Sequence, residues 1–211
     1  MSRYCLVTDL DKCIGCHACE VACKNENDVA LGVYWNHLIQ VGPHGTFPEL
    51  EQYWLSLQCQ QCENAPCLEV CPTGATYRDE QGRILVDEAS CIGCKQCMDA
   101  CPYGVRSYDA QKSVVQKCSM CSHLTDKGED PACVAACCAN ARFWGDLDDP
   151  DSDVSQALAG ADEAAIHSLA DSGNAPLTRY ILSEKVAQWI PLEELAPASD
   201  TTGAPYFKVS E

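Results

Sequence analysis

The sequence predicts an α+β fold in which short helices and short strand pairs surround four copies of one cysteine motif. Two observations lead to this prediction. The 211-residue chain contains 18 cysteines, and sixteen of them fall into four groups with related spacing. Between the groups, short β-type segments alternate with turn-forming residues. A chain of this length holds one or two compact domains.

The third cysteine group has the best-defined spacing. It runs C-x2-C-x2-C-x3-C-P from Cys91 to Pro102. Bacterial-type ferredoxins bind cubane iron–sulfur clusters with this spacing, and the fourth cysteine ligates a second cluster. One such motif therefore requires a partner motif elsewhere in the chain.

The other three groups repeat this spacing with changes in the second gap. The first group is followed by Lys24 and the second by Pro72, and Cys138 follows the fourth. In chain order, the groups are Cys13, Cys16, Cys19 and Cys23; Cys59, Cys62, Cys67 and Cys71; Cys91, Cys94, Cys97 and Cys101; Cys118, Cys121, Cys133 and Cys137. Short and long gaps alternate, which indicates an internal duplication.

The duplication predicts nested two-cluster ferredoxin units, a four-cluster polyferredoxin with a loop insertion and a C-terminal extension. Residues 59–101 form the inner unit, and residues 1–23 with 102–145 form the outer unit. The ligand exchange between paired motifs then assigns four [4Fe–4S] clusters to these sets: Cys59, Cys62, Cys67 and Cys101; Cys71, Cys91, Cys94 and Cys97; Cys13, Cys16, Cys19 and Cys137; Cys23, Cys118, Cys121 and Cys133.

Structural zinc is the alternative for these cysteines, since C-x2-C pairs also bind zinc. Zinc ribbons lack the fourth cysteine three residues on, so the pattern favours clusters. Cys5 and Cys138 are left over. Cys5 reads as a small buried strand residue. Cys138 is adjacent to Cys137 and could replace it as a ligand through a register slip.

The segments between the motifs predict short elements. Residues 4–8 read as a strand, and residues 75–78 with 84–87 and residues 105–108 with 113–116 read as two strand pairs. Residues 24–58 are an insertion rich in aromatic and turn-forming residues, where we expect irregular structure with short strands. We expect it to dock a partner, and simple cover for the clusters is the alternative.

The C-terminal segment, residues 146–211, changes in composition. We expect an N-cap at residues 151–153 before a helix over 154–158, a second short helix near 163–170, and a strand over 178–182. The rest reads as an extended arm that contacts a partner, because its apolar residues would otherwise be exposed. These are Trp189, Ile190, Leu192, Tyr206 and Phe207.

Four polar residues near the motifs have two interpretations each. His17 and His123 lie inside motifs, where they either adjust a cluster potential or occupy the surface. Lys95 and Lys117 either raise the potential of a neighbouring cluster or are simply solvated.

Charge and composition exclude several function classes. The formal net charge of −17 makes nucleic acid or an anionic membrane an unexpected partner. No apolar run is long enough for a membrane span, and no secretory signal precedes the first motif. We find no nucleophile–base set, phosphate loop or open metal position. Electron transfer, not catalysis by this chain, is the predicted function.

The nested motif order and five short stretches resemble the iron–sulfur (beta) subunits of dimethyl sulfoxide reductase-family molybdenum enzymes. These stretches are CENAPC (62–67), CPTGA (71–75), CPYGV (101–105), QKC (116–118) and GDLDDP (145–150). The resemblance covers roughly residues 4–160. It implies four [4Fe–4S] clusters in a row, docked on a large catalytic subunit that carries a molybdenum or tungsten bis-pyranopterin guanine dinucleotide cofactor.

The resemblance leaves the substrate branch open. The open branches are catechol or aromatic dehydroxylase-like or transhydroxylase-like enzymes, and arsenate, polysulfide or dimethyl sulfoxide reductase-like enzymes. A membrane anchor or a quinol or cytochrome donor is a further expected partner. We expect the protein either at the extracytoplasmic face, reached by co-export with the catalytic subunit, or in the cytoplasm. A free-standing polyferredoxin, a zinc-binding interaction module and a redox sensor are the alternative functions.

Overall fold

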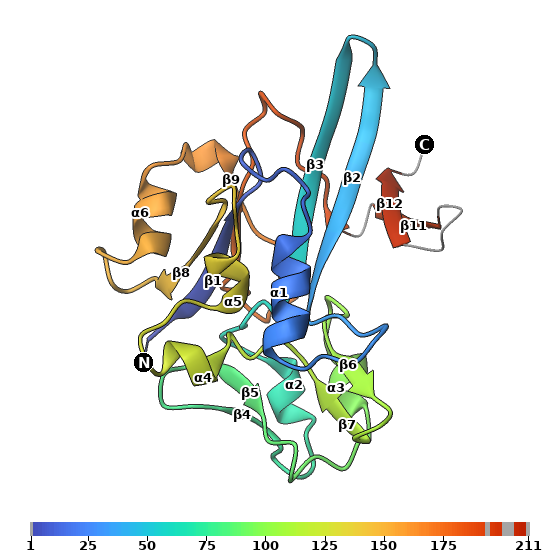
Figure 1. Cartoon of the computed structure of the whole chain (residues 1–211), viewed down its shortest axis with the longest axis vertical. Helices are drawn as coiled ribbons and strands as arrows, with labels where there is room; N and C mark the ends of the chain where they lie inside the picture. The colour runs from blue at the N-terminus through green and yellow to red at the C-terminus, as the bar shows by residue number, and fades with distance from the viewer. Residues whose placement is uncertain (1, 193–194, 200–204, 210–211) are drawn as a thin grey trace.

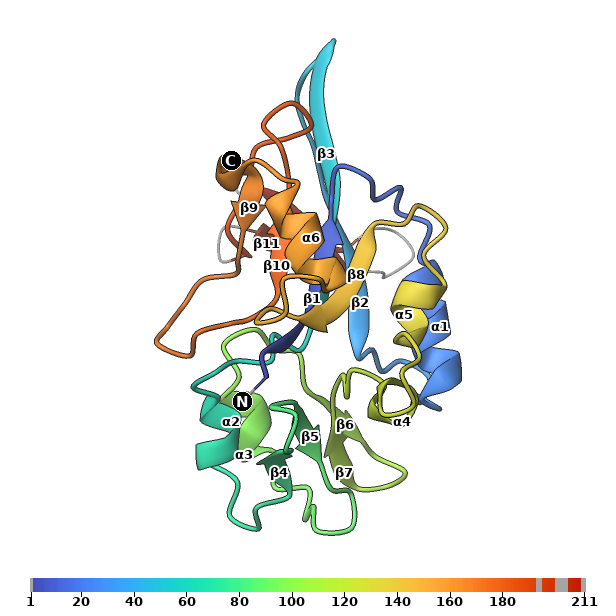
Figure 2. The same ribbon diagram turned by 90° about the vertical axis from the view of Figure 1, so that its left-hand side faces the viewer.

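The computed structural model describes residues 2–192, 195–199 and 205–209, the last two ranges by their backbone alone. Helices are few and short, and the fold is mixed α and β. Figure 1 shows two regions: a lower lobe with α2, α3 and β4–β7, and an upper part from which the β2–β3 hairpin projects. The same division is visible after a quarter turn (Figure 2).

The sheet of the upper part has the strand order β8-β1-β10-β9. The N-terminal strand β1 pairs antiparallel with β8 and parallel with β10, so it lies inside the sheet. Its residues are almost all buried, as expected for an apolar strand in this position. The bounds are β1 Tyr4–Asp9, β8 Arg142–Asp146, β9 Ile166–His167 and β10 Arg179–Ile181.

The hairpin consists of β2 (Asn36–Thr46) and β3 (Glu49–Gln58). Its base is buried and its tip is exposed. The backbone of β12 (Pro205–Val209) pairs with β2, and β11 (Leu195–Ser199) pairs with β12. The expectation of irregular structure over residues 24–58 is therefore wrong for residues 36–58, where apolar residues on both strands pair across a long hairpin.

The lower lobe contains two small antiparallel strand pairs and two one-turn helices. Both strand pairs were predicted, and the structure confirms them within one or two residues. The bounds are β4 Thr76–Arg78, β5 Ile84–Val86, β6 Ser107–Asp109, β7 Val114–Gln116, α2 Pro66–Glu69 and α3 Gln96–Asp99.

The remaining helices lie beside the cysteine motifs or cover the upper sheet. They are α1 Ala18–Glu26, α4 Ser122–Thr125, α5 Ala132–Ala135 and α6 Asp153–Ala159. The predicted N-cap of α6 is confirmed, because the Ser155 N–H donates to the Ser152 side chain. The second predicted helix is wrong: residues 163–165 form one 3-10 turn, and β9 then pairs with β10.

The expectation that the C-terminal arm needs a partner to cover its apolar residues is wrong for its first part. Ile190 is buried in the main core, and Trp189 packs on Tyr53 and Tyr180 of the same chain. The side chains of Tyr206 and Phe207 lie outside the described residues. No helix in the described part of the chain is long and apolar enough to cross a membrane.

Candidate metal centres

All four cysteine motifs share one backbone feature. The residue two positions after the first cysteine has a positive φ in each motif: Gly15 (67°), Gln61 (49°), Gly93 (67°) and Met120 (57°). This left-handed residue turns the chain, so that the next cysteine faces the same interior as the first. The N–H of Met120 donates to the sulfur of Cys118 at 3.4 Å, which ties the loop to its own first cysteine.

Two of these positions require glycine for space as well as for conformation. A Cβ at Gly15 would lie 2.2 Å from the Trp54 ring, and one at Gly93 would lie 2.5 Å from the Ser113 carbonyl oxygen. Real Cβ contacts are never this close, so the Ile-Gly pair of the first and third motifs has a structural cause.

Three cavities gather the cysteines of two motifs each. Each cavity is lined by three cysteines from one motif and one from its partner motif, in these groups: Cys13, Cys16, Cys19 and Cys137; Cys23, Cys118, Cys121 and Cys133; Cys71, Cys91, Cys94 and Cys97. We call these cavities A, B and D. Cavities A and B lie between elements that are distant in sequence but adjacent in the fold, such as α1 and α5.

The fourth group, which we call site C, lies in the lower lobe. Burial raises the pKa of the Cys62 thiol to about 11, a hydrogen bond from Asn174 opposes this, and the charges of Cys59, Cys101 and Cys67 add to it. Cys59, Cys62 and Cys67 belong to the main core, and Cys101 packs against it. Cys59, Cys62 and Cys67 are buried, and Cys101 is partly exposed.

The four groups fit clusters better than single ions. A tetrahedral zinc ion with Zn–S bonds of about 2.3 Å draws its sulfurs close together. No three His, Cys, Asp or Glu side chains in the described residues converge closely enough for one metal ion. The donors in each group are four thiols, which is the donor set of a [4Fe–4S] cluster. The assignment of individual cysteines as ligands stays a prediction.

Backbone N–H groups point at cysteine sulfurs in several motifs. Thr76 donates to Cys71 at 3.4 Å. Val115 donates to Cys91 at 3.4 Å, and Ala141 donates to Cys137 at 3.3 Å. Hydrogen bonds to cluster-ligating sulfur raise the reduction potential by stabilising the added negative charge.

Two asparagines that the sequence did not single out also face sulfur atoms. Asn174 Nδ2 lies 3.0 Å from Cys62 Sγ, and Asn27 Nδ2 lies 3.6 Å from Cys121 Sγ. Asn174 belongs to the C-terminal segment, 112 residues from Cys62. No local spacing connects it to a motif, so only the fold reveals it.

The polar residues inside the motifs differ in their surroundings. His17 pairs with Glu20 at 2.7 Å and His123 with Glu26 at 2.8 Å, both at partly or fully exposed positions. Lys95 is exposed, with its ammonium 3.9 Å from the centre of the Tyr108 ring. Lys117 is buried, so simple solvation does not describe it.

The two cysteines outside the motifs occupy opposite environments. Cys5 is fully buried in β1, which confirms its expected structural place, and burial raises the pKa of its thiol to about 12. Cys138 is exposed, and its sulfur lies 3.8 Å from that of Cys16.

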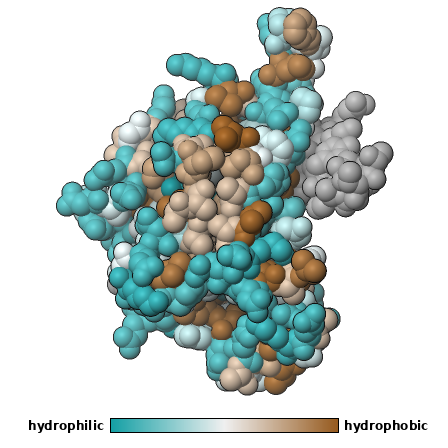
Figure 3. Space-filling model, in the orientation of Figure 1, coloured by the Kyte–Doolittle hydropathy of each residue, from teal (hydrophilic) through white to brown (hydrophobic). Residues whose placement is uncertain are grey.

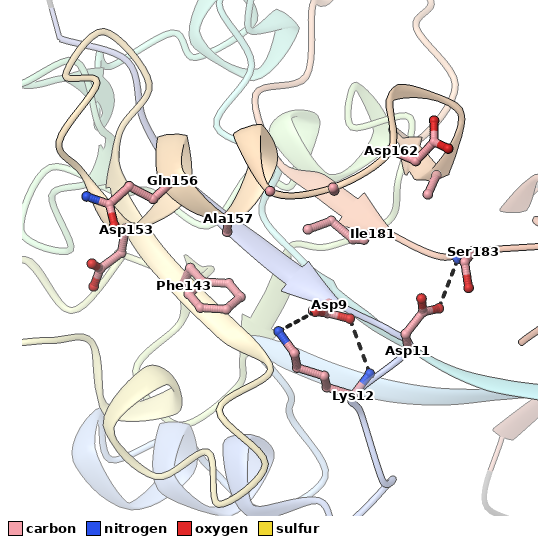
Figure 4. Close-up of a pocket in the computed structure, with 13 residues that line it drawn as sticks. Asp9, Asp11, Lys12, Phe143, Asp153, Gln156, Ala157, Asp162, Ile181 and Ser183 are labelled. Atoms are coloured by element: carbon pink, nitrogen blue, oxygen red, sulfur yellow. Dashed lines mark hydrogen bonds and ion pairs between the residues drawn. The ribbon is translucent and has the colours of Figure 1, made fainter.

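A further surface pocket lies between β1, β8 and α6, away from the cysteines (Figure 4). Three of its charged residues bond to neighbours within the chain. Lys12 pairs with Asp9 at 2.7 Å, and Asp11 accepts from the Ser183 N–H at 2.9 Å. None of its lining residues is a cysteine, and we assign it no role.

Comparison with known proteins identifies the cysteine regions. Residues 50–147 match the model of a 4Fe-4S dicluster domain, and residues 6–26 match that of a 4Fe-4S binding domain. The chain is 41% identical to a Halobacterium salinarum protein assigned as the iron–sulfur subunit of a dimethyl sulfoxide reductase, over 87% of this chain and 80% of the relative.

Two further relatives extend this similarity. The chain is 39% identical to one subunit of the sulfite dehydrogenase of Allochromatium vinosum, over 92% of this chain and 89% of the relative. It is 38% identical to the iron–sulfur subunit of the arsenate respiratory reductase of a Shewanella species, over 74% of this chain and 87% of the relative.

The fold and the cysteine groups are those of a ferredoxin-type electron-transfer protein. Within that class, the chain belongs to the iron–sulfur subunits of dimethyl sulfoxide reductase-family molybdenum oxidoreductases. The predicted family is confirmed.

Proposed function

We propose that this chain relays electrons through four [4Fe–4S] clusters, to or from a large catalytic subunit that carries a molybdenum or tungsten bis-pyranopterin cofactor. The observation that carries this proposal is the gathering of sixteen cysteines into four groups of four, each drawn from two motifs. When bound, such clusters supply one-electron redox chemistry. The chain itself makes and breaks no substrate bonds.

The protein would supply the cluster ligands, fix the distances between clusters and set the dielectric of their surroundings. The cysteines of A, B, C and D would hold one cluster each. Burial of most of these thiols favours the exclusion of water, which together with hydrogen bonds to sulfur sets each potential. The nested pairing supports a four-cluster arrangement of an outer unit, with A and B, and an inner unit, with C and D.

The order of the four sites follows from neighbouring cysteines. Cys19, at A, and Cys133, at B, pack in one small apolar cluster, and Cys118, at B, shares the main core with Cys59, at C. Sites C and D share the inner ferredoxin unit. We therefore propose a linear relay in the order A, B, C, D.

Exposed apolar residues support contact with a partner. Ile14 at cavity A and Val21 of α1 are both 65% exposed, and Phe47 and Leu50 at the hairpin tip are 84% and 53% exposed. The face that carries α1 shows apolar side chains gathered near its middle (Figure 3). Buried aromatic and aliphatic anchors at an interface are typical of specific binding. We propose these surfaces for docking the catalytic subunit.

The catalytic subunit, not this chain, would bind the substrate and determine its identity. Relatives are named for dimethyl sulfoxide, sulfite, arsenate and thiosulfate chemistry. We propose a reductase of this family, with the aromatic dehydroxylase and transhydroxylase branch still included. The proposed site of action is the extracytoplasmic face, reached by co-export, or the cytoplasm. Cell fractionation decides between them.

An anaerobic purification of the tagged chain from its host tests the proposal. Iron, sulfide, zinc, molybdenum and tungsten are measured on the product. We expect molybdenum or tungsten and one large co-purifying chain, whose sequence gives the substrate class. A chain fully loaded with iron but without partner would indicate a free-standing polyferredoxin, and zinc without iron would contradict the proposal.

A further inference from the structure

Four cationic side chains are buried in the described part of the chain: Arg83, Arg106, Lys117 and Arg142. Burying a charge is costly unless opposite charges or hydrogen bonds compensate. Arg83 has two such partners, because it bonds to Asp79 and Asp126, each at 2.7 Å. The other three pair with no carboxylate of the described residues.

Arg142 lies between sites A and B. Its side chain lines both cysteine cavities. Its Nη2 atom is 3.6 Å from Cys133 Sγ, on the B side. On the A side, Arg142 lines the same cavity as Cys19 and Cys137. The Nε atom is buried with no hydrogen-bond partner in the described residues.

Lys117 lies between sites B and C. Its ammonium donates to the Cys118 carbonyl oxygen at 2.8 Å and to the Ile84 carbonyl oxygen. On the B side, Lys117 directly precedes Cys118 in the chain. On the C side, the Ile84 N–H donates to Gln61 Oε1 at 2.7 Å, and Gln61 stands between Cys59 and Cys62 in the second motif.

Arg106 lies between sites C and D. Its Nη1 atom donates to Thr76 Oγ1 at 3.2 Å, and Thr76 lines cavity D. The Arg106 guanidinium also faces the sulfur of Cys67 at C and that of Cys97 at D, as a side-chain hydrogen-bond donor to each. Its buried Nη2 atom has no hydrogen-bond partner in the described residues.

We propose that Arg142, Lys117 and Arg106 form a series of potential-setting cations, one at each junction of the relay A, B, C, D. Each raises the reduction potentials of the two clusters that flank it. The inference rests on the proposed function, because it requires [4Fe–4S] clusters at the four sites.

The physical reason is the charge that moves in each transfer. One electron leaves the donor site and one arrives at the acceptor, and no proton or atom is exchanged. The reduced site therefore carries one more negative charge, inside a protein whose formal net charge is already −17. A cation that faces both sites stabilises this charge on either side. It raises both reduction potentials. The direction of electron flow is then set by the redox partners at the two ends of the relay.

The internal duplication supplies two of the three cations. Arg106 stands five residues after Cys101, and Arg142 stands five residues after Cys137, so they occupy the same place after the third and fourth motifs. This repeated position was visible in the sequence, although its meaning depends on the burial of both guanidinium groups.

The test measures cluster potentials in the full-length, anaerobically purified chain. The neutral variants are Arg142→Met, Lys117→Met and Arg106→Met, and the charge-retaining variants are Arg142→Lys, Lys117→Arg and Arg106→Lys. Arg83→Met is the matched control, since it also removes a buried cation. Iron and sulfide are counted in every sample, and a redox titration followed by electron paramagnetic resonance gives the midpoint potentials.

We expect each neutral variant to make reduction of its two flanking clusters at least tenfold less favourable, a shift of about 59 mV for one electron. The charge-retaining variants and Arg83→Met should leave all potentials close to wild type.

Full iron content with unchanged potentials in the neutral variants would overturn the inference and leave the proposed function intact. The three neutral variants could instead lose their clusters while the charge-retaining variants keep them. That result would indicate a structural role for the cations and would also overturn the inference. Wild-type protein without four clusters would contradict the proposed function itself.

Discussion

At the scale of single residues, side chains remote in sequence complete the surroundings of the cysteines. Asn174 reaches site C from the C-terminal segment and donates to both Cys62 Sγ, at 3.0 Å, and the Tyr103 hydroxyl, at 2.7 Å. An amide aimed at a ligand sulfur stabilises the reduced state of the attached cluster, because that state is more negative.

Replacing Asn174 by Val should therefore lower the potential of one cluster. A net hydrogen bond contributes about 0.5–1.5 kcal/mol, which corresponds to roughly 20–65 mV for one electron. A redox titration followed by electron paramagnetic resonance measures the shift. Asn64→Ala serves as control, because Asn64 bonds to Gly173 of the same loop but not to sulfur. Equal shifts in both variants would contradict the role of Asn174.

The cysteines could be identified from the sequence, but most of the polar residues that surround them could not. A repeated spacing of four thiols has one dominant chemical interpretation. Asn174 has no such spacing to Cys62, and only the folded chain brings it there. Arg142 has a repeated place after its motif, but its burial beside Cys133 appears only in the fold.

At the scale of elements, the short strand pairs followed directly from local pattern, but the β2–β3 hairpin did not. The buried alternation of β2 is interrupted where the register shifts between Val41 and His44, and Gly42 and Pro43 read as turn formers. A bulge inside a long strand looks like a loop in sequence. Over residues 166–167, pairing with β10 likewise replaced the expected helix.

The exposed tip of this hairpin predicts a partner contact. Phe47→Ser combined with Leu50→Ser should leave iron content unchanged, since both side chains are exposed and outside the core. Loss of apolar anchors should weaken binding of the large catalytic chain by about 2 kcal/mol or more, roughly 30-fold. Quantitative co-purification measures this.

The matched control for the hairpin tip is Tyr77→Ser, an exposed aromatic in β4 of the lower lobe. If the tip variant captures the partner as well as wild type does, the proposed docking role of the hairpin is wrong.

The cap of α6 gives a stability prediction. Ser152 accepts from the Ser155 N–H at 3.3 Å and donates to the Asp146 carbonyl oxygen at 2.7 Å. Ser152→Ala should lower the free energy of unfolding by about 1 kcal/mol, which shifts Tm by about 2–4 °C for a chain of this size. Ser152→Asp, which retains an N-cap acceptor, should lose less. A Tm for Ser152→Ala equal to wild type would contradict the capping role.

At the scale of the whole molecule, the cysteines are part of the core. The main core includes Cys59, Cys62, Cys67, Cys97 and Cys118 beside its aliphatic and aromatic residues. The sheets of the lower lobe have only two strands each, and isolated two-stranded sheets are marginally stable. Clusters would therefore hold together regions that the polypeptide alone stabilises weakly.

Removal of the clusters should largely unfold the chain, because the free energy of cluster binding contributes directly to the free energy of folding. We expect loss of near-ultraviolet circular dichroism and of a cooperative thermal transition after anaerobic treatment with a chelator and an oxidant. A cluster-free chain that still melts cooperatively would show that its apolar core suffices.

The most direct test of the four-cluster relay is the count of iron, sulfide and electrons per chain. The anaerobically purified protein should contain about sixteen irons and sixteen sulfides, four for each of four clusters, and accept about four electrons in a reductive titration. About eight irons and two electrons would mean that only one of the two ferredoxin units binds clusters, and the relay through A, B, C and D would be wrong.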